Sequence, residues 1–165
     1  FSPWREKAVF GTEDFEGGGP SFLSFLCDRL IPHVEENLGE RNGMRFIMGY
    51  SLAGLFSAWA FYEREIFYGM ASASGSLWFS GFTDYVLSHP LKEEHVVYLS
   101  LGSKEERTKN PVMARIGDLT RQMEGILKKD SKILKVKYEL NSGGHFANVP
   151  KRMQKAVRWL LDQDK

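Results

Sequence analysis

The chain has 165 residues, enough for one domain with a hydrophobic core and too few for two full domains. Apolar residues make up 42% and charged residues 26%, a composition that excludes a disordered or fibrous chain. The formal net charge of +1 argues against a nucleic-acid-binding protein, which would gather lysine and arginine on one face. The densest basic stretch, residues 128–137, is best explained as solvated surface.

Cysteine content and hydropathy give expectations about location and cofactors. Cys27 is the single cysteine and cannot form an internal disulfide, so we expect a reducing, cytoplasmic environment. The sequence contains no run of about 18 apolar residues, and its amino terminus lacks the pattern of a signal peptide, so we expect no membrane span. No residues have metal-ligand spacing, and we expect neither a metal ion nor an organic cofactor.

The amino-terminal part predicts a long loop followed by a helix. Residues 1–19 are rich in glycine, proline and aromatic residues without periodicity, and Pro20 favours the start of a helix. Pro32 is expected to kink this helix, and Gly39 to end it. The apolar residues that recur at helical spacing are Phe22, Leu23, Leu26, Leu30 and Val34.

The rest of the chain predicts strands that alternate with helices. Short apolar runs indicate strands at residues 45–48, 67–73, 95–101 and 133–140. Helical patterns begin at Leu52, cover residues 82–88, follow Asn110-Pro111 and begin again near Val149, with Met153, Val157, Leu160 and Leu161 on one face. This alternation predicts an α/β fold with a mostly parallel sheet and helices on both faces.

The segment from Met48 to Gly54 lies where a strand is expected to turn sharply into a helix, which is the setting of a nucleophile elbow. Small residues on either side of Ser51 would let the strand and the helix approach closely. The N–H of Leu52 would then point from a helix amino terminus and could stabilise an oxyanion. Ala53 replaces the last glycine of the usual G-x-S-x-G pattern, and a serine that caps a helix explains the run equally well.

A histidine and a carboxylate could complete a catalytic set. His145 follows the last predicted strand in a glycine-rich loop, from which it can reach the carboxyl edge of the sheet. Glu105 and Glu106 follow the strand at 95–101, and either could orient the imidazole. The order serine, acid, histidine is that of α/β-hydrolases. The other histidines lie within a helix, in a turn and at the wrong end of a strand: His33, His89 and His95.

Together these motifs resemble the Putative esterase family, which includes esterase D-like enzymes and enzymes that open trilactone siderophores. The resemblance covers nearly the whole chain. It is carried by Ser2-Pro3-Trp4, the glycine-rich stretch before Pro20, Gly49 to Leu55, Ser72 to Trp78, Leu101 to Glu106, and Gly144-His145-Phe146.

The resemblance implies an α/β-hydrolase fold with Ser51, Glu105 and His145 at the triad positions. Glu105, rather than Glu106, matches the family's acid position, three residues after the glycine that ends the strand. The resemblance also implies that the loop around Ser74 and Trp78 borders the substrate pocket. Residue chemistry alone favours Trp4 and Trp78 as core aromatic residues, although their positions in loops on either side of the elbow make substrate contact plausible.

We therefore expect a serine hydrolase that cleaves a small-molecule carboxylic ester through an acyl-enzyme intermediate. His145 would be the general base for Ser51, and Leu52 would supply an oxyanion N–H. A thioesterase or acyltransferase would use the same residues. The alternative from another class is a catalytically silent binding domain with the hydrolase fold.

A last expectation concerns the extent of the domain, which we place over residues 1–165. α/β-Hydrolases have their elbow after several strands, yet only a loop and one helix precede it here, and the chain begins with Phe1 rather than methionine. We therefore expect an N-terminally incomplete domain with at most about four parallel strands and one open edge on the strand that ends at Gly49. The second oxyanion N–H would lie upstream or in the loop Ser2 to Arg5, near the pocket mouth.

Overall fold

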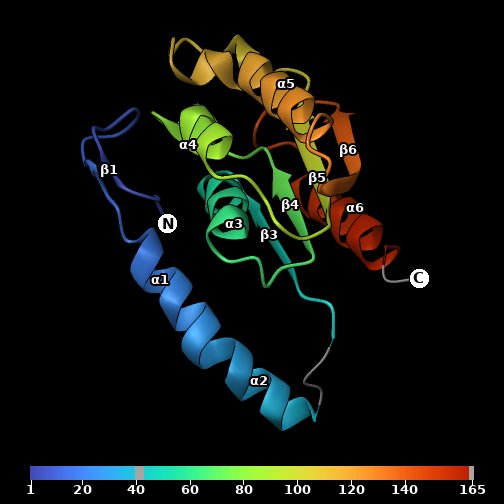
Figure 1. Cartoon of the computed structure of the whole chain (residues 1–165). Helices are drawn as coiled ribbons and strands as arrows, with labels where there is room; N and C mark the ends of the chain where they lie inside the picture. Colours follow the sequence, from blue (N-terminus) through green and yellow to red (C-terminus); the bar gives the residue numbers. More distant parts are fainter. Residues whose placement is uncertain (40–42, 164–165) are drawn as a thin grey trace.

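The computed structural model describes residues 1–39 and 43–163, and its centre is a sheet of four parallel strands. The strands are β3 (Phe46–Tyr50), β4 (Gly69–Ala73), β5 (His95–Gly102) and β6 (Ile133–Asn141), and they lie side by side in chain order (Figure 1). Each lies within about two residues of its predicted position. The predicted fold class is confirmed, and so is the expected number of strands in the described part of the chain.

Helices cover both faces of this sheet. They are α3 (Leu52–Glu63), α4 (Phe82–Ser88), α5 (Ile116–Leu127) and α6 (Val149–Leu161). On one face α3 and α5 pack against the strands with α4 between them, whereas α6 lies on the other face (Figure 1). Side chains of β5 alternate accordingly, because Val97 and Leu99 join the core under α3 and α5, and Tyr98 joins the core under α6. β5 is buried along its whole length, as its continuous apolar run predicted.

The buried face of α6 differs from the predicted one. Val157 and Leu161 are 37% and 55% exposed. The residues that α6 buries lie four positions apart: Arg152, Ala156 and Leu160. Because this buried face includes the charged residue Arg152, the pattern of apolar residues predicted a neighbouring face of the helix instead.

The amino-terminal segment contains more order than predicted. Within the expected loop, β1 (Arg5–Glu6) and β2 (Phe15–Glu16) form a small antiparallel hairpin. The following helix consists of α1 (Gly19–Phe25), a π-helical turn η1 (Leu26–Leu30) and α2 (Ile31–Leu38), and it runs away from the sheet (Figure 1). Because Pro32 has no N–H for the carbonyl group four residues earlier, the irregularity falls in the turn before it. Gly39 ends the helix, as predicted, and it does so in the left-handed conformation.

Two further features concern the surface of the described residues. β3 has a hydrogen-bonded neighbour, β4, on one side of the described sheet, and the prediction that another segment or chain covers its other side stays a prediction. Among residues 1–39 and 43–163, no helix combines the length and the apolarity that crossing a membrane requires.

Candidate active site

Ser51 occupies the sharp turn between β3 and α3, with φ 57° and ψ −121°. These angles are rare for a residue with a side chain and indicate a strained turn. A Cβ atom on Gly49 would collide with the carbonyl oxygen of Ala53. A Cβ atom on Gly54 would lie 2.8 Å from the Cα of Gly75. The close approaches thus require glycine at positions 49 and 54.

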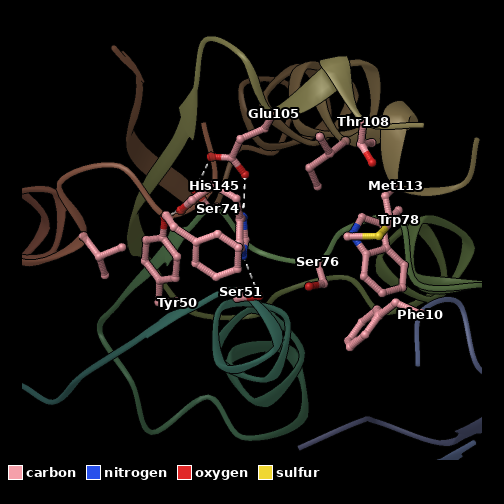
Figure 2. Close-up of a pocket in the computed structure, with 13 residues that line it drawn as sticks. Phe10, Tyr50, Ser51, Ser74, Ser76, Trp78, Glu105, Thr108, Met113 and His145 are labelled. Atoms are coloured by element: carbon pink, nitrogen blue, oxygen red, sulfur yellow. Dashed lines mark hydrogen bonds and ion pairs between the residues drawn. The ribbon is translucent and has the colours of Figure 1, made fainter. Parts of the chain in front are cut away.

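The side chains of Ser51, His145 and Glu105 form one hydrogen-bonded chain (Figure 2). The Nε2 atom of His145 lies 3.0 Å from the Oγ of Ser51, and its Nδ1 atom lies 2.7 Å from Oε2 of Glu105. Glu106 points elsewhere, and its carboxylate accepts a hydrogen bond of 2.7 Å from Arg121. Of the two candidate acids, the structure therefore brings Glu105 to the histidine.

The turns after β5 and β6 bring the acid and the histidine together, although they are 40 residues apart in the chain. The N–H of Lys104 donates to the carbonyl of Gly143 at 3.0 Å, and the N–H of Ser103 donates to Asn141 at 2.8 Å. A Cβ atom on Gly102 would lie 2.6 Å from the carbonyl oxygen of Gly143, so glycine is needed for this approach. Because the strands are parallel and adjacent, their carboxyl ends present both residues at the same edge of the sheet.

Glu105 is nearly buried, at 8% exposed. Burial by itself raises the pKa of this carboxyl group, but hydrogen bonds from His145, Ser74 and the Gly102 N–H outweigh it and hold the pKa below its usual value. Ser74 and Gly102 donate to Oε1, each at 2.6 Å. Glu105 is therefore an ionised acceptor for the imidazole.

Leu52 is the first residue of α3, so its N–H is one of those at a helix amino terminus that have no partner within the helix. The loop Ser2 to Arg5 lies elsewhere. The carbonyl oxygen of Ser2 accepts a hydrogen bond from Gly19 at 2.9 Å, and its hydroxyl accepts one from Gly17. None of the residues from Ser2 to Arg5 is among those that line the cavity beside Ser51, so the expectation that this segment lies near the pocket mouth gains no support.

The side chains of Ser51, His145 and Glu105 open into a cavity of about 590 Å³. Trp78, Met113 and Phe10 lie opposite these three side chains (Figure 2). Phe10 belongs to the β1–β2 hairpin, and its ring centroid lies 6.1 Å from that of Trp78. The remaining lining residues are Tyr50, Ser74, Ser76, Thr108, Ile116, Phe146 and Val149. The cavity is therefore mainly apolar and aromatic.

The two tryptophans proposed as substrate-contacting residues have different positions. Trp78 lines the cavity and is 8% exposed. Trp4 does not line it. Its indole N–H donates to the carbonyl of Ser80 at 3.2 Å, and its ring packs against Phe79 and Tyr85. Trp4 is thus a packing residue, as its residue chemistry alone favoured.

Three polar residues surround Ser51, His145 and Glu105. Sequence reasoning missed Tyr50 and Arg152, and it placed Ser74 only in a loop that borders the pocket. Tyr50 ends β3, Ser74 follows β4 with φ 46°, and Arg152 lies in α6. Arg152 stands four residues before Ala156 on the face that α6 buries, but a charged residue does not mark a buried face, so no sequence signal indicated its role. The hydrogen bonds of Tyr50 and Ser74 likewise depend on partners from distant parts of the chain.

Known proteins resemble this chain in sequence and in fold. The family described as Putative esterase matches residues 2–147. An uncharacterised protein of Bacillus subtilis (strain 168), YbbA, is 27% identical over 175 residues, covering 100% of this chain and 69% of YbbA.

Two solved structures illustrate the likeness in fold. The siderophore hydrolase EstA of Aspergillus nidulans superposes with a TM-score of 0.78 at 20% identity, covering 93% of this chain and 61% of EstA. An IroE-like serine hydrolase of Shewanella oneidensis superposes with a TM-score of 0.79 at 18% identity, covering 96% of this chain and 54% of that protein. The chain thus spans less than two thirds of either protein. From the family match and the fold, the chain belongs to the Putative esterase family of hydrolases with an α/β-hydrolase fold.

Proposed function

We propose that the protein is a serine esterase that cleaves a carboxylic ester through an acyl-enzyme intermediate. The observation that supports this most is the hydrogen-bonded chain from Ser51 through His145 to the buried Glu105, at the edge of an apolar cavity. The proposed nucleophile, base and orienting acid lie within hydrogen-bonding distance of one another, which is the arrangement that triad chemistry uses.

In the proposed reaction, Nε2 of His145 accepts the proton of Ser51 as the Oγ atom attacks the ester carbonyl carbon. The N–H of Leu52 donates to the oxygen that becomes negative. When the tetrahedral intermediate collapses, the imidazolium returns the proton to the departing alcohol and the acyl group remains on Ser51. His145 then takes a proton from water, and the oxygen of that water adds to the acyl carbon. When this second tetrahedral intermediate collapses, the bond between the acyl carbon and Ser51 Oγ breaks, the imidazolium returns its proton to Oγ, and the acid leaves.

The residues that line the cavity favour an uncharged, apolar substrate. Among its lining residues only Glu105 and His145 carry a formal or titratable charge near neutral pH, and these two are hydrogen-bonded to each other. A charged acyl group would lose hydration without gaining a partner of opposite charge. EstA is described as a siderophore hydrolase, so a siderophore ester belongs in the substrate panel beside short-chain and aromatic esters.

The test is a comparison of Ser51→Ala with Ser80→Ala, which changes an exposed serine outside the cavity. We expect Ser51→Ala to lower ester turnover by several orders of magnitude, because triad members act as a unit. A fluorophosphonate probe should label the parent and Ser80→Ala but not Ser51→Ala. Unchanged hydrolysis in purified Ser51→Ala would refute the assignment.

Matched oxygen and thioester substrates with the same acyl group separate an esterase from a thioesterase. We expect the oxygen ester to be cleaved at least as fast. A parent protein that neither cleaves either substrate nor takes the probe would support the silent binding domain instead.

A further inference from the structure

Arg152 is a buried cation that connects the ends of three strands around the triad. The residue is 1% exposed, and an unpaired guanidinium at such a position would be strongly unfavourable. Its Nη2 atom donates to Oε1 of Glu105 at 3.0 Å and also to the hydroxyl of Ser74. Its Nη1 atom donates to the hydroxyl of Tyr50 at 2.7 Å. The partners follow β5, follow β4 and end β3, respectively.

The hydrogen atoms of this network can point in only one way. A guanidinium donates and never accepts, so the hydroxyls of Ser74 and Tyr50 must accept from Arg152. The single hydrogen of Ser74 is then directed to Oε1 of Glu105, and that of Tyr50 to the backbone carbonyl of His145. Arg152 therefore orients the acid through its side chain and the histidine through its main chain.

The two oxygens of Glu105 have separate tasks in this arrangement. Oε1 accepts hydrogen bonds from Gly102, Ser74 and Arg152. Oε2 remains for Nδ1 of His145 at 2.7 Å. Because Oε1 is held from three sides, the carboxylate cannot rotate away from the imidazole without breaking several hydrogen bonds.

We propose that Arg152 is the positioning residue of the triad: it orients Glu105 and His145 and opposes protonation of the pair that they form. This rests on the proposed esterase function. The sign of the charge effect is definite, because a positive charge beside the pair disfavours an added proton on either member. The charged and titratable groups that face the pair from the packed elements are Arg152 from α6, Tyr50 from β3 and Tyr138 from β6.

The experiment measures the pH dependence of kcat/KM for the parent, Arg152→Met and Arg152→Lys. The acidic limb is the part of the kcat/KM profile that falls as pH is lowered. Arg152→Met lacks the charge, so we expect its acidic limb to lie about one pH unit higher than that of the parent. We also expect its kcat to fall about 10- to 100-fold with little change in KM. Arg152→Lys keeps the charge but not the planar fork, so its limb should stay near that of the parent while kcat falls partway. Arg158→Met, an exposed arginine on the same helix, is the control and should match the parent.

A second variant keeps the proposal testable if Arg152→Met does not fold. Tyr50→Phe removes the hydrogen bond to the carbonyl of His145 and retains the charge of Arg152, so kcat should fall while the acidic limb stays in place. NMR titration of the His145 ring follows protonation without substrate. A parent without Ser51-dependent hydrolysis would refute the esterase function, whereas the ring titration would still report the effect of Arg152. Folded Arg152→Met with the kcat, acidic limb and ring titration of the parent would overturn the proposal.

Discussion

At the scale of single residues, the site distinguishes two adjacent carboxylates of the same chemistry. Glu105 is buried against His145, whereas Glu106 lies at the surface beside Arg121, with its side chain 41% exposed. The distinction arises from direction, because neighbouring side chains in the short helix η2 (Glu105–Arg107) diverge. One faces the carboxyl edge of the sheet and the other faces α5.

The first residue-scale prediction compares Glu105→Gln with Glu106→Gln. The amide keeps the shape of the side chain but removes the charge that stabilises the imidazolium and orients its tautomer, so Glu105→Gln should lower kcat by about 1,000-fold or more. Glu106→Gln loses an exposed ion pair and should stay within about threefold of the parent. Steady-state kinetics on one ester decides between them. Equal losses in both variants would contradict the assignment.

The second residue-scale prediction concerns stability in acid. The folded pKa of Glu105 lies below the unfolded value, which is about 4.3, so the folded state binds its proton less readily. The resulting stabilisation is present above about pH 4.3 and is lost as pH falls through the folded pKa. The melting temperature of the parent should therefore fall as pH is lowered through that window. The melting temperature of Glu105→Gln should depend less on pH. Identical pH dependence in both proteins would contradict this.

At the scale of elements, the turn between β3 and α3 depends on the two glycines Gly49 and Gly54, which allow the strand and the helix to approach closely. Gly49→Ala would force its Cβ atom against the carbonyl oxygen of Ala53, which belongs to the backbone and so gives way less easily than the end of a flexible side chain. We expect a loss of about 3 kcal/mol or more, with Ser51 displaced and activity lost. Chemical denaturation and kinetics measure both effects.

The matched control is Gly125→Ala in α5, where a Cβ atom would have no neighbour within 4 Å. Because alanine is the better helix former, this change should stabilise the protein by about 0.5 to 1 kcal/mol. If Gly49→Ala destabilised the protein no more than this control, the claim that position 49 has no space for a side chain would be contradicted.

At the scale of the whole molecule, burial is uneven across the layers. β5 lies between β4 and β6 and is buried throughout, whereas α2 buries none of its residues and β3 borders the described sheet. Native-state hydrogen exchange should therefore be slowest in β5 and fast in α2 and in the β1–β2 hairpin. If β3 exchanges as slowly as β5, another segment or a second copy covers its free edge. Fast exchange along β3 would contradict the prediction that this edge is covered.

The features that depend on near neighbours in the chain could be predicted from the amino-acid sequence. Apolar runs and helical periodicity located the four strands and the helices that follow them. The small residues around Ser51 indicated the elbow, because a tight turn is a local steric constraint. The positions of Ser51, Glu105 and His145 at strand ends followed from the parallel order of the strands, and the choice of Glu105 over Glu106 came from family resemblance.

Contacts between residues far apart in the chain could be identified only in the folded structure. Tyr50 and His145 are 95 residues apart, and Arg152 and Glu105 are 47 apart, so no local pattern connects them. The same holds for Trp4, which packs against Phe79 and Tyr85 rather than lining the cavity. A hydrogen bond or packing contact depends on the meeting of two surfaces in three dimensions, whereas periodicity reports only which residues of one element share a face.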